Sequence, residues 1–231
     1  MAVQSPGQIP LRFLFSAAAI SVGVCLWAAL STRPDCAFAV NTLAQGAIYA
    51  NEKLINAAKK VITYMYHTRE LGIGYDRSKG GHLEGYVDAS WLERRSQTGF
   101  TFLLANGSIS HKSKKQELTA MSSCEAELIA ASRATLELIY LRFFLEFLGV
   151  KLHGPTSLMI DSQSAIDLAN NDRSTSRTKH LRRRDWKLRE AIEEGVAQAK
   201  KIHTSLNPSD ILTKPLVGQS FLMHRDKLLN C

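Results

Sequence analysis

The sequence predicts an α/β fold in which a five-stranded sheet is covered by helices. From residue 84 onward, short strand-like runs come first and segments with the longer helical period follow. An Asn106-Gly107 pair between two apolar runs is typical of a β-hairpin. Helical segments separate the later strands, as in sheets built with crossover connections. The 231 residues, 45% of them hydrophobic and 22% charged, are sufficient to bury a core.

A helical segment is predicted ahead of the sheet, at residues 1–75. Residues 51–69 form an amphipathic helix, because Leu54, Ala58 and Val61 fall on one face. The uncharged run 13–30 fits either a buried helix of a folded domain or a signal or membrane segment.

The sheet domain is placed at residues 84–216, after a Gly-rich linker at 76–83 and before a tail at 217–231. Its predicted elements, in chain order, are strands 84–88, 99–104 and 108–116, helix 123–148, strand 157–160, helices 162–170 and 181–194, strand 197–206 and helical turn 209–214. The long helix is recognised by an apolar stripe of Ile129, Leu136, Tyr140, Phe143 and Phe147.

Four acidic residues stand at the ends of predicted elements. Asp88 and Asp161 each close an apolar strand, Glu125 opens the long helix, and Asp210 opens the last helical turn. Because sites in α/β sheets gather at strand ends and helix starts, these carboxylates could converge at one edge of the sheet. Converging carboxylates repel one another unless divalent cations neutralise them, and Mg²⁺ prefers hard oxygen ligands. Two ions held in this way can hydrolyse a phosphodiester bond.

Each acid also has a structural interpretation. Glu125 lies three residues after Ser122, which is the spacing of a capping box. Asp161 and Asp210 could each cap the helix that follows, and Asp88 could be a solvated loop residue. Capping and metal binding are compatible, so the spacing alone leaves both interpretations open.

The charge balance favours a polyanionic partner. There are 29 Lys and Arg against 21 Asp and Glu, which gives a net charge of +8 and a pI near 9.4. Basic side chains release counterions when they approach phosphates. The cysteines, Cys25, Cys36, Cys124 and Cys231, have no CxxC spacing, which argues against a disulfide framework or a zinc ribbon.

Seven short motifs then identify a family. In order they are GYVDASW (85–91), RRSQTGF (94–100), SKKQ (113–116), SSCEAEL (122–128), DSQSAI (161–166), SRTKH (176–180) and SDILTKPL (209–216). Together they resemble the ribonuclease H domain of copia-type LTR retrotransposons. The resemblance implies a ribonuclease H-like mixed five-stranded sheet flanked by helices, and Mg²⁺-dependent cleavage of the RNA strand of RNA–DNA hybrids. It also implies that two Mg²⁺ ions, for which Mn²⁺ can substitute, are held by the catalytic residues Asp88, Glu125, Asp161 and Asp210.

The upstream region resembles another part of the same polyprotein. STRPDCAFAVN (31–41) and NAAKKVITYMYHT (56–68) are similar to the end of the reverse transcriptase and its connection to the nuclease. The implied partners are therefore the hybrid and the remainder of a reverse transcriptase polyprotein. The run 13–30 falls where the family has a helix, so we favour a buried helix, a cytoplasmic or nuclear location and no membrane partner. The alternative is a membrane-anchored protein that has captured this domain.

Departures from the family keep a second function open. Arg183 and Lys187 occupy positions that are usually apolar, and Ser162 stands where Asn is usual. A copy with such changes could be a catalytically inactive remnant that only binds nucleic acid.

A basic segment supplies candidate nucleic-acid contacts. Arg182, Trp186 and Arg189 share one helical face that could hold a phosphate backbone and stack a base, or could be a solvated face with a half-buried Trp. His180 could contact the hybrid or cap a helix.

Overall fold

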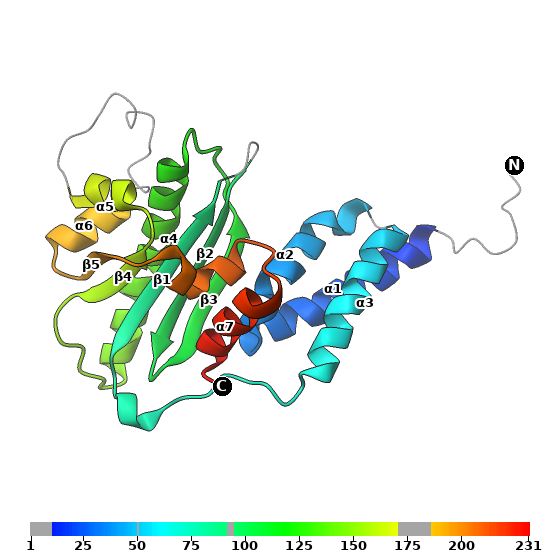
Figure 1. The fold of residues 1–231 in the computed structure, drawn as a ribbon, viewed down its shortest axis with the longest axis horizontal. Coiled ribbons are helices and arrows are strands. Elements are labelled where there is room, and N and C mark those ends of the chain that lie inside the picture. Colours follow the sequence, from blue (N-terminus) through cyan, green and yellow to red (C-terminus); the bar gives the residue numbers. More distant parts are fainter. Residues whose placement is uncertain (1–10, 50, 92–94, 171–185) are drawn as a thin grey trace, which may run out of the picture.

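Five strands form one mixed sheet in the computed structural model, which describes residues 11–49, 51–91, 95–170 and 186–231 (Figure 1). The sheet order is β3-β2-β1-β4-β5, with β1–β2 and β2–β3 antiparallel and β4 parallel to both β1 and β5. The strand bounds are β1 Leu83–Ser90, β2 Gln97–Leu104, β3 Gly107–Lys115, β4 Thr156–Ile160 and β5 Ala197–Lys201. The predicted mixed sheet with flanking helices is confirmed.

Helices cover this sheet and precede it (Figure 1). Their bounds are α1 Leu11–Ser31, α2 Ala37–Gly46, α3 Glu52–His67, α4 Ser123–Phe147, α5 Gln163–Asn170, α6 Lys187–Glu193 and α7 Gly218–Leu229. Short 3-10 helices include η1 (Pro34–Cys36) and η6 (Pro208–Leu212).

The β2–β3 hairpin turns one residue earlier than the Asn-Gly pair suggests. Leu104 pairs with Gly107, so the two-residue loop is Ala105-Asn106, and both loop residues have positive φ, 51° and 65°. Two positive φ angles are typical of the primed turns that match strand twist. The Asn106-Gly107 pair therefore locates the hairpin, but Gly107 lies outside the loop as the first residue of β3.

Helix α4 packs on the sheet through a different face from its predicted apolar stripe. Its buried face, with Leu128, Leu138 and Leu145 among others, joins the core formed by β1, β2 and β4. Of the stripe, Ile129 is buried, but Leu136, Tyr140, Phe143 and Phe147 are 47%, 60%, 69% and 78% exposed. Both faces of α4 are apolar, so periodicity identifies the helix but not the face that meets the sheet.

The N-terminal helices pack against one another and against the sheet domain. Cys25 and Ala29 of α1 are buried with Cys36 and Val40, which agrees with a helix that buries one face. Among the described residues, no helix combines the length and apolarity needed to cross a bilayer.

The segment predicted to be a tail contains helix α7. Its Leu228 packs with Ile211 and Leu212 of η6 and with Ala37 of α2. Helix α7 therefore joins the N-terminal helices to the sheet domain. Whether residues 1–75 and 84–216 fold independently stays a prediction.

His111 of β3 links the sheet to α1 and makes stability depend on pH. Its Nε2 donates to the carbonyl oxygen of Ala29 over 2.6 Å. Burial lowers the pKa of His111, although the bond to Ala29 opposes this shift. The unfolded chain, where the histidine pKa is about 6.5, therefore takes up a proton more readily than the folded protein. The stabilisation is present above that pH and is lost as the pH falls through it.

We therefore expect the free energy of unfolding of the wild type to fall more between pH 7.5 and pH 5 than that of His111→Gln. Urea unfolding at a series of pH values measures this difference. Parallel pH profiles for the two proteins would contradict the assignment.

Candidate metal centre

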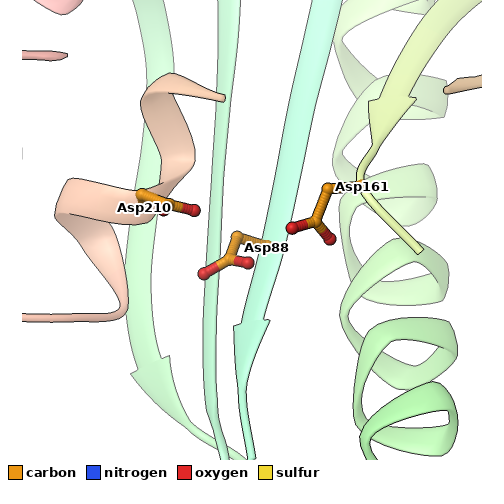
Figure 2. A group of neighbouring side chains, drawn as sticks. All are labelled: Asp88, Asp161 and Asp210. Atoms are coloured by element: carbon orange, nitrogen blue, oxygen red, sulfur yellow. The ribbon is translucent and has the colours of Figure 1, made fainter. Parts of the chain in front are cut away.

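Three aspartates converge beside the central strand β1, with Asp88 between Asp210 and Asp161 (Figure 2). Asp88 belongs to β1, Asp161 follows β4, and Asp210 lies in η6. Each offers a carboxylate oxygen, and these oxygens all lie within 4.8 Å of one another. Strand pairing explains part of this arrangement, because Val87 of β1 pairs with Ile160 of the parallel β4, so the next residues, Asp88 and Asp161, are neighbours.

Asp161 and Asp210 are not the residues that cap the helices beside them, because neighbouring side chains accept those hydrogen bonds. The Ser162 hydroxyl accepts from the backbone N–H of Ala165 at the start of α5. The Asn207 side chain accepts from the N–H of Ser209 at the start of η6. The Asp161 carboxylate instead accepts a hydrogen bond from the Thr204 hydroxyl at 2.9 Å. Asp88 is buried, so it is not a solvated loop residue.

Segment η6 is fixed against the sheet by buried polar contacts, and this places Asp210. The Asn207 amide donates to the carbonyl of Val87 at 2.8 Å, one residue before Asp88. The Ser113 hydroxyl of β3 donates to the carbonyl of Leu212 at 2.6 Å. Both donors are buried, so loss of either would leave a carbonyl unsatisfied.

Gly99 permits the close approach of η6 to β2. It lies opposite Asp88 in the strand register. A Cβ atom there would come within 2.6 Å of Thr213 Cγ2 and 2.8 Å of Leu212 Cβ. The glycine of the RRSQTGF motif is therefore required by packing beneath the acidic residues.

We expect Gly99→Ala to lower the free energy of unfolding by about 1–3 kcal/mol, the usual cost of overpacking a core. Chemical denaturation measures it, with Gly72→Ala as the control, because a Cβ at Gly72 meets nothing within 4 Å. Equal stability of the two variants would show that η6 can move away at no cost.

The acidic residues are partly neutralised by Lys214. Its Nζ lies 3.3 Å from Asp88 Oδ2 and 3.1 Å from Asp210 Oδ1. Burial alone would lower the pKa of Lys214, but Asp88 and Asp210 raise it above its ordinary value. The Thr213 hydroxyl also donates to Asp88.

Burial raises the pKa of two of the aspartates. For Asp88 the pKa rises to about 6, with Lys214 opposing the shift and Asp210 adding to it. The pKa of Asp210 is raised mainly by burial, and Lys214 again opposes the shift. A cation that neutralised these groups would relieve this cost of keeping them ionised.

Glu125 does not join the three aspartates. Its carboxylate accepts from the backbone N–H of Met121 at 2.8 Å, and its own N–H donates to the Ser122 hydroxyl at 3.2 Å. These two contacts cap the start of α4 in a variant of the capping box, in which Glu125 reaches Met121, the residue before the N-cap Ser122. Among the described residues, the group within 4.8 Å comprises Asp88, Asp161 and Asp210 and leaves out both Glu125 and Glu127. The geometry therefore matches the structural interpretation of Glu125.

Glu127 is the glutamate that faces the site, and the sequence reasoning missed it. Its Oε1 accepts from the N–H of Ala89 at 3.1 Å, beside Asp88. Burial raises the pKa of Glu127 to about 9, and the charges of Asp88 and Asp161 add to the shift. Its buried Oε2 has no hydrogen-bond partner among the described residues. The SSCEAEL motif contains both glutamates, and residues two apart on a helix face nearly opposite ways.

The carboxylates present fit a divalent cation with oxygen ligands. Three aspartate oxygens lie close together, and the buried Oε2 of Glu127 has no hydrogen-bond partner in the described part of the chain. Such hard donors suit Mg²⁺ or Mn²⁺ rather than softer metals. Buried oxygens without partners are costly, and a bound cation would satisfy them.

The candidate nucleic-acid contacts are only partly described. His180 and Arg182 lie outside the described residues. The Arg189 guanidinium lies 4.3 Å from the centroid of the Trp186 ring and donates to the carbonyl of Leu168 at 2.6 Å. Trp186 is half-buried against the core. This burial matches the interpretation in which the helix face is solvated and its Trp is half-buried. A nucleic-acid role for these four residues stays a prediction.

Comparison with known proteins finds relatives that include a transposon Pol polyprotein and a secreted effector. The chain is 36% identical over 209 residues to the retrovirus-related Pol polyprotein from transposon TNT 1-94 of Nicotiana tabacum, a match covering 87% of this chain and 15% of the polyprotein. It is 38% identical over 125 residues to secreted RxLR effector protein 161 of Plasmopara viticola, covering 52% of this chain and 88% of the effector. The chain thus spans about 15% of the length of the tobacco polyprotein.

Solved structures match part of the chain at lower sequence identity. The ribonuclease H1 LC11, isolated from compost, matches with a TM-score of 0.45 and 17% identity, covering 58% of this chain and 93% of that enzyme. No protein-family model matches the chain.

Proposed function

Because the chain belongs to the retrovirus-related Pol polyproteins of copia-type transposons, we propose that its sheet domain is a Mg²⁺-dependent endonuclease of the ribonuclease H type. The substrate is the RNA strand of an RNA–DNA hybrid. The observation that carries the proposal is the convergence of Asp88, Asp161 and Asp210 within 4.8 Å in a chain of net charge +8. Acids gathered at one point of a basic chain suit a site that holds a cation against a phosphate.

In this function the catalytic acids are Asp88, Asp161 and Asp210, with Glu127 in place of the predicted Glu125. They would hold Mg²⁺, which when bound activates water and stabilises charge at a phosphodiester. The protein keeps its own groups in place: Thr213 and Lys214 contact Asp88, and the N–H of Ala89 holds Glu127. Side chains fixed in this way need little reorganisation during a reaction.

The hybrid would be recognised through its shape and backbone rather than its sequence. A-form helices present 2′-hydroxyls and phosphates in a wide, shallow groove, and these mark the RNA strand. The surplus of Lys and Arg supplies the attraction to phosphates. We propose the remainder of a reverse transcriptase polyprotein as a further partner, because 87% of this chain matches about 15% of the tobacco Pol polyprotein.

The two glutamates of α4 give a matched pair of variants for this function. We expect Glu127→Gln to reduce hybrid cleavage by about 10–100-fold, the range found when groups supporting a metal site are removed. Glu125→Gln should keep most activity and cost at most about 0.5–2 kcal/mol of stability through the weakened cap. A labelled-RNA cleavage assay, with thermal melting of both variants, measures these effects.

The reverse order of activities would restore Glu125 as the fourth acid. Absence of cleavage by the wild type at any Mg²⁺ or Mn²⁺ concentration, with hybrid binding retained, would favour the inactive nucleic-acid-binding remnant.

A further inference from the structure

A basic pocket lies where strands β1 and β4 begin. Its volume is about 390 Å³, and three separate segments of the chain contribute basic side chains to its wall. Lys79 and His82 come from the segment before β1, Arg142 comes from α4, and Lys151 and His153 come from the segment before β4. No acidic side chain is among the described residues that line it.

This pocket is separate from the acidic residues of the candidate metal centre. Leu83 begins β1 at the pocket, and Asp88 lies near the other end of the same strand. At about 3.3 Å per residue along a strand, these two positions are roughly 17 Å apart. Thr156 begins β4 at the pocket in the same way, and Asp161 follows the last residue of β4. A group bound in the pocket is therefore out of reach of the three aspartates.

Arg142 is the cation of this pocket whose position is fixed. Its side chain is 15% exposed, and its Nη1 donates to the carbonyl oxygen of Gly154 at 3.0 Å and to the hydroxyl of Thr156 at 2.8 Å. Its Nη2 lies 3.8 Å from Glu146 Oε1, which is beyond hydrogen-bonding distance. A planar guanidinium held in this way is suited to the oxygens of a phosphate.

Lys79 and Lys151 bring two exposed ammonium groups to the same pocket. The acid nearby in the chain, Asp76, is engaged elsewhere, because its carboxylate accepts from the N–H and the hydroxyl of Ser78. These hydrogen bonds lower the pKa of Asp76, and the charge of Lys79 adds to the shift. The histidine rings of His82 and His153 supply further N–H donors at the wall of the pocket.

We propose that this pocket is a phosphate-binding site outside the nuclease centre. Cations gathered around one pocket repel one another, and a bound anion removes that repulsion. A phosphate fits better than a carboxylate, because it carries more negative charge and presents three acceptor oxygens to cations that come from three segments. The phosphate belongs either to the backbone of a nucleic-acid strand or to a free ion. The inference does not rest on the nuclease function, since no acid of the metal centre takes part.

Binding of a strand is measured by fluorescence anisotropy with a short labelled single-stranded RNA and the full chain, in EDTA so that no divalent cation bridges the RNA to the aspartates. We expect Lys79→Gln/Lys151→Gln to weaken binding by about tenfold at low salt and to reduce the salt slope by about 1 or more. The matched control is Lys53→Gln/Lys60→Gln on α3, which removes the same charge from exposed positions and should bind within about twofold of the wild type.

Binding of a free ion is measured by isothermal titration of inorganic phosphate into the same three proteins, again in EDTA. Loss of phosphate binding in Lys79→Gln/Lys151→Gln, with binding retained in the control, supports the site and identifies a free ion as a ligand. Loss of RNA binding without any measurable binding of inorganic phosphate supports the site and identifies the strand backbone as the ligand.

Two results would overturn the inference. One is a wild-type protein that binds neither the RNA nor inorganic phosphate, and this result needs no variant to fold. The other is an equal loss of RNA binding in both double variants, with equal melting temperatures and no difference in phosphate binding, because the attraction would then follow net charge rather than this pocket.

Discussion

Replacement of Asp88 by Asn is expected to lower the rate of hybrid cleavage by more than about 100-fold, because loss of groups that only support a metal ligand already costs about 10–100-fold. Asp88 is buried and lies at the centre of the site, within 4.8 Å of the oxygens of Asp161 and Asp210. Asn keeps the size of the side chain and an oxygen for the Thr213 hydroxyl but removes the charge that a cation needs.

The control for this prediction is Asp167→Asn on α5. Asp167 is an exposed acid whose carboxylate accepts from Gln163 at 2.9 Å and takes no part in the cluster. We expect it to cleave at the wild-type rate under the same Mg²⁺ concentration. If Asp88→Asn retains more than about a tenth of the wild-type rate, Asp88 is not a metal ligand.

Replacement of Asp35 by Asn is expected to lower the free energy of unfolding by about 3–5 kcal/mol, the usual cost of breaking a buried ion pair. The Asp35 side chain is 0% exposed and pairs with Arg33 at 2.8 Å. It also accepts from the Tyr64 hydroxyl at 2.7 Å, while Arg33 donates to the Thr68 hydroxyl at 2.7 Å. The substitution would leave the Arg33 guanidinium buried without its counter-charge.

This network connects η1 to the end of α3, so its loss should loosen the N-terminal helices together. Urea unfolding of the full chain measures the effect. The control is Glu70→Gln, which breaks an ion pair between Arg69 and Glu70. These side chains are 62% and 89% exposed, and exposed ion pairs contribute little to stability. A loss below about 1 kcal/mol for Asp35→Asn would show that the buried pair does not hold these helices in place.

Local patterns in the sequence were sufficient to predict the sheet and most of its helices. Strand β1 alternates between Val87, which faces α4, and Asp88, which faces η6, and such alternation can be read without tertiary information. The end of β4 at Ile160 likewise places Asp161 beside Asp88 once the strands are taken as parallel.

Helix faces were harder to predict. Helix α4 carries apolar residues all round, so the exposed Tyr140 and Phe147 were indistinguishable from the buried Leu138 and Leu145. The same uncertainty affected Glu125 and Glu127, since only the position of the helix on the sheet decides which one meets Asp88. The role of Lys214 depends on the fold of η6 and was not visible in the spacing of the acids.

The most direct test is an anomalous diffraction map of crystals of the chain grown with Mn²⁺. The account predicts a peak within about 2.5 Å of carboxylate oxygens of both Asp88 and Asp161, at the coordination distances of hard divalent cations. Manganese bound elsewhere on the protein, with no peak between these two residues, would contradict it.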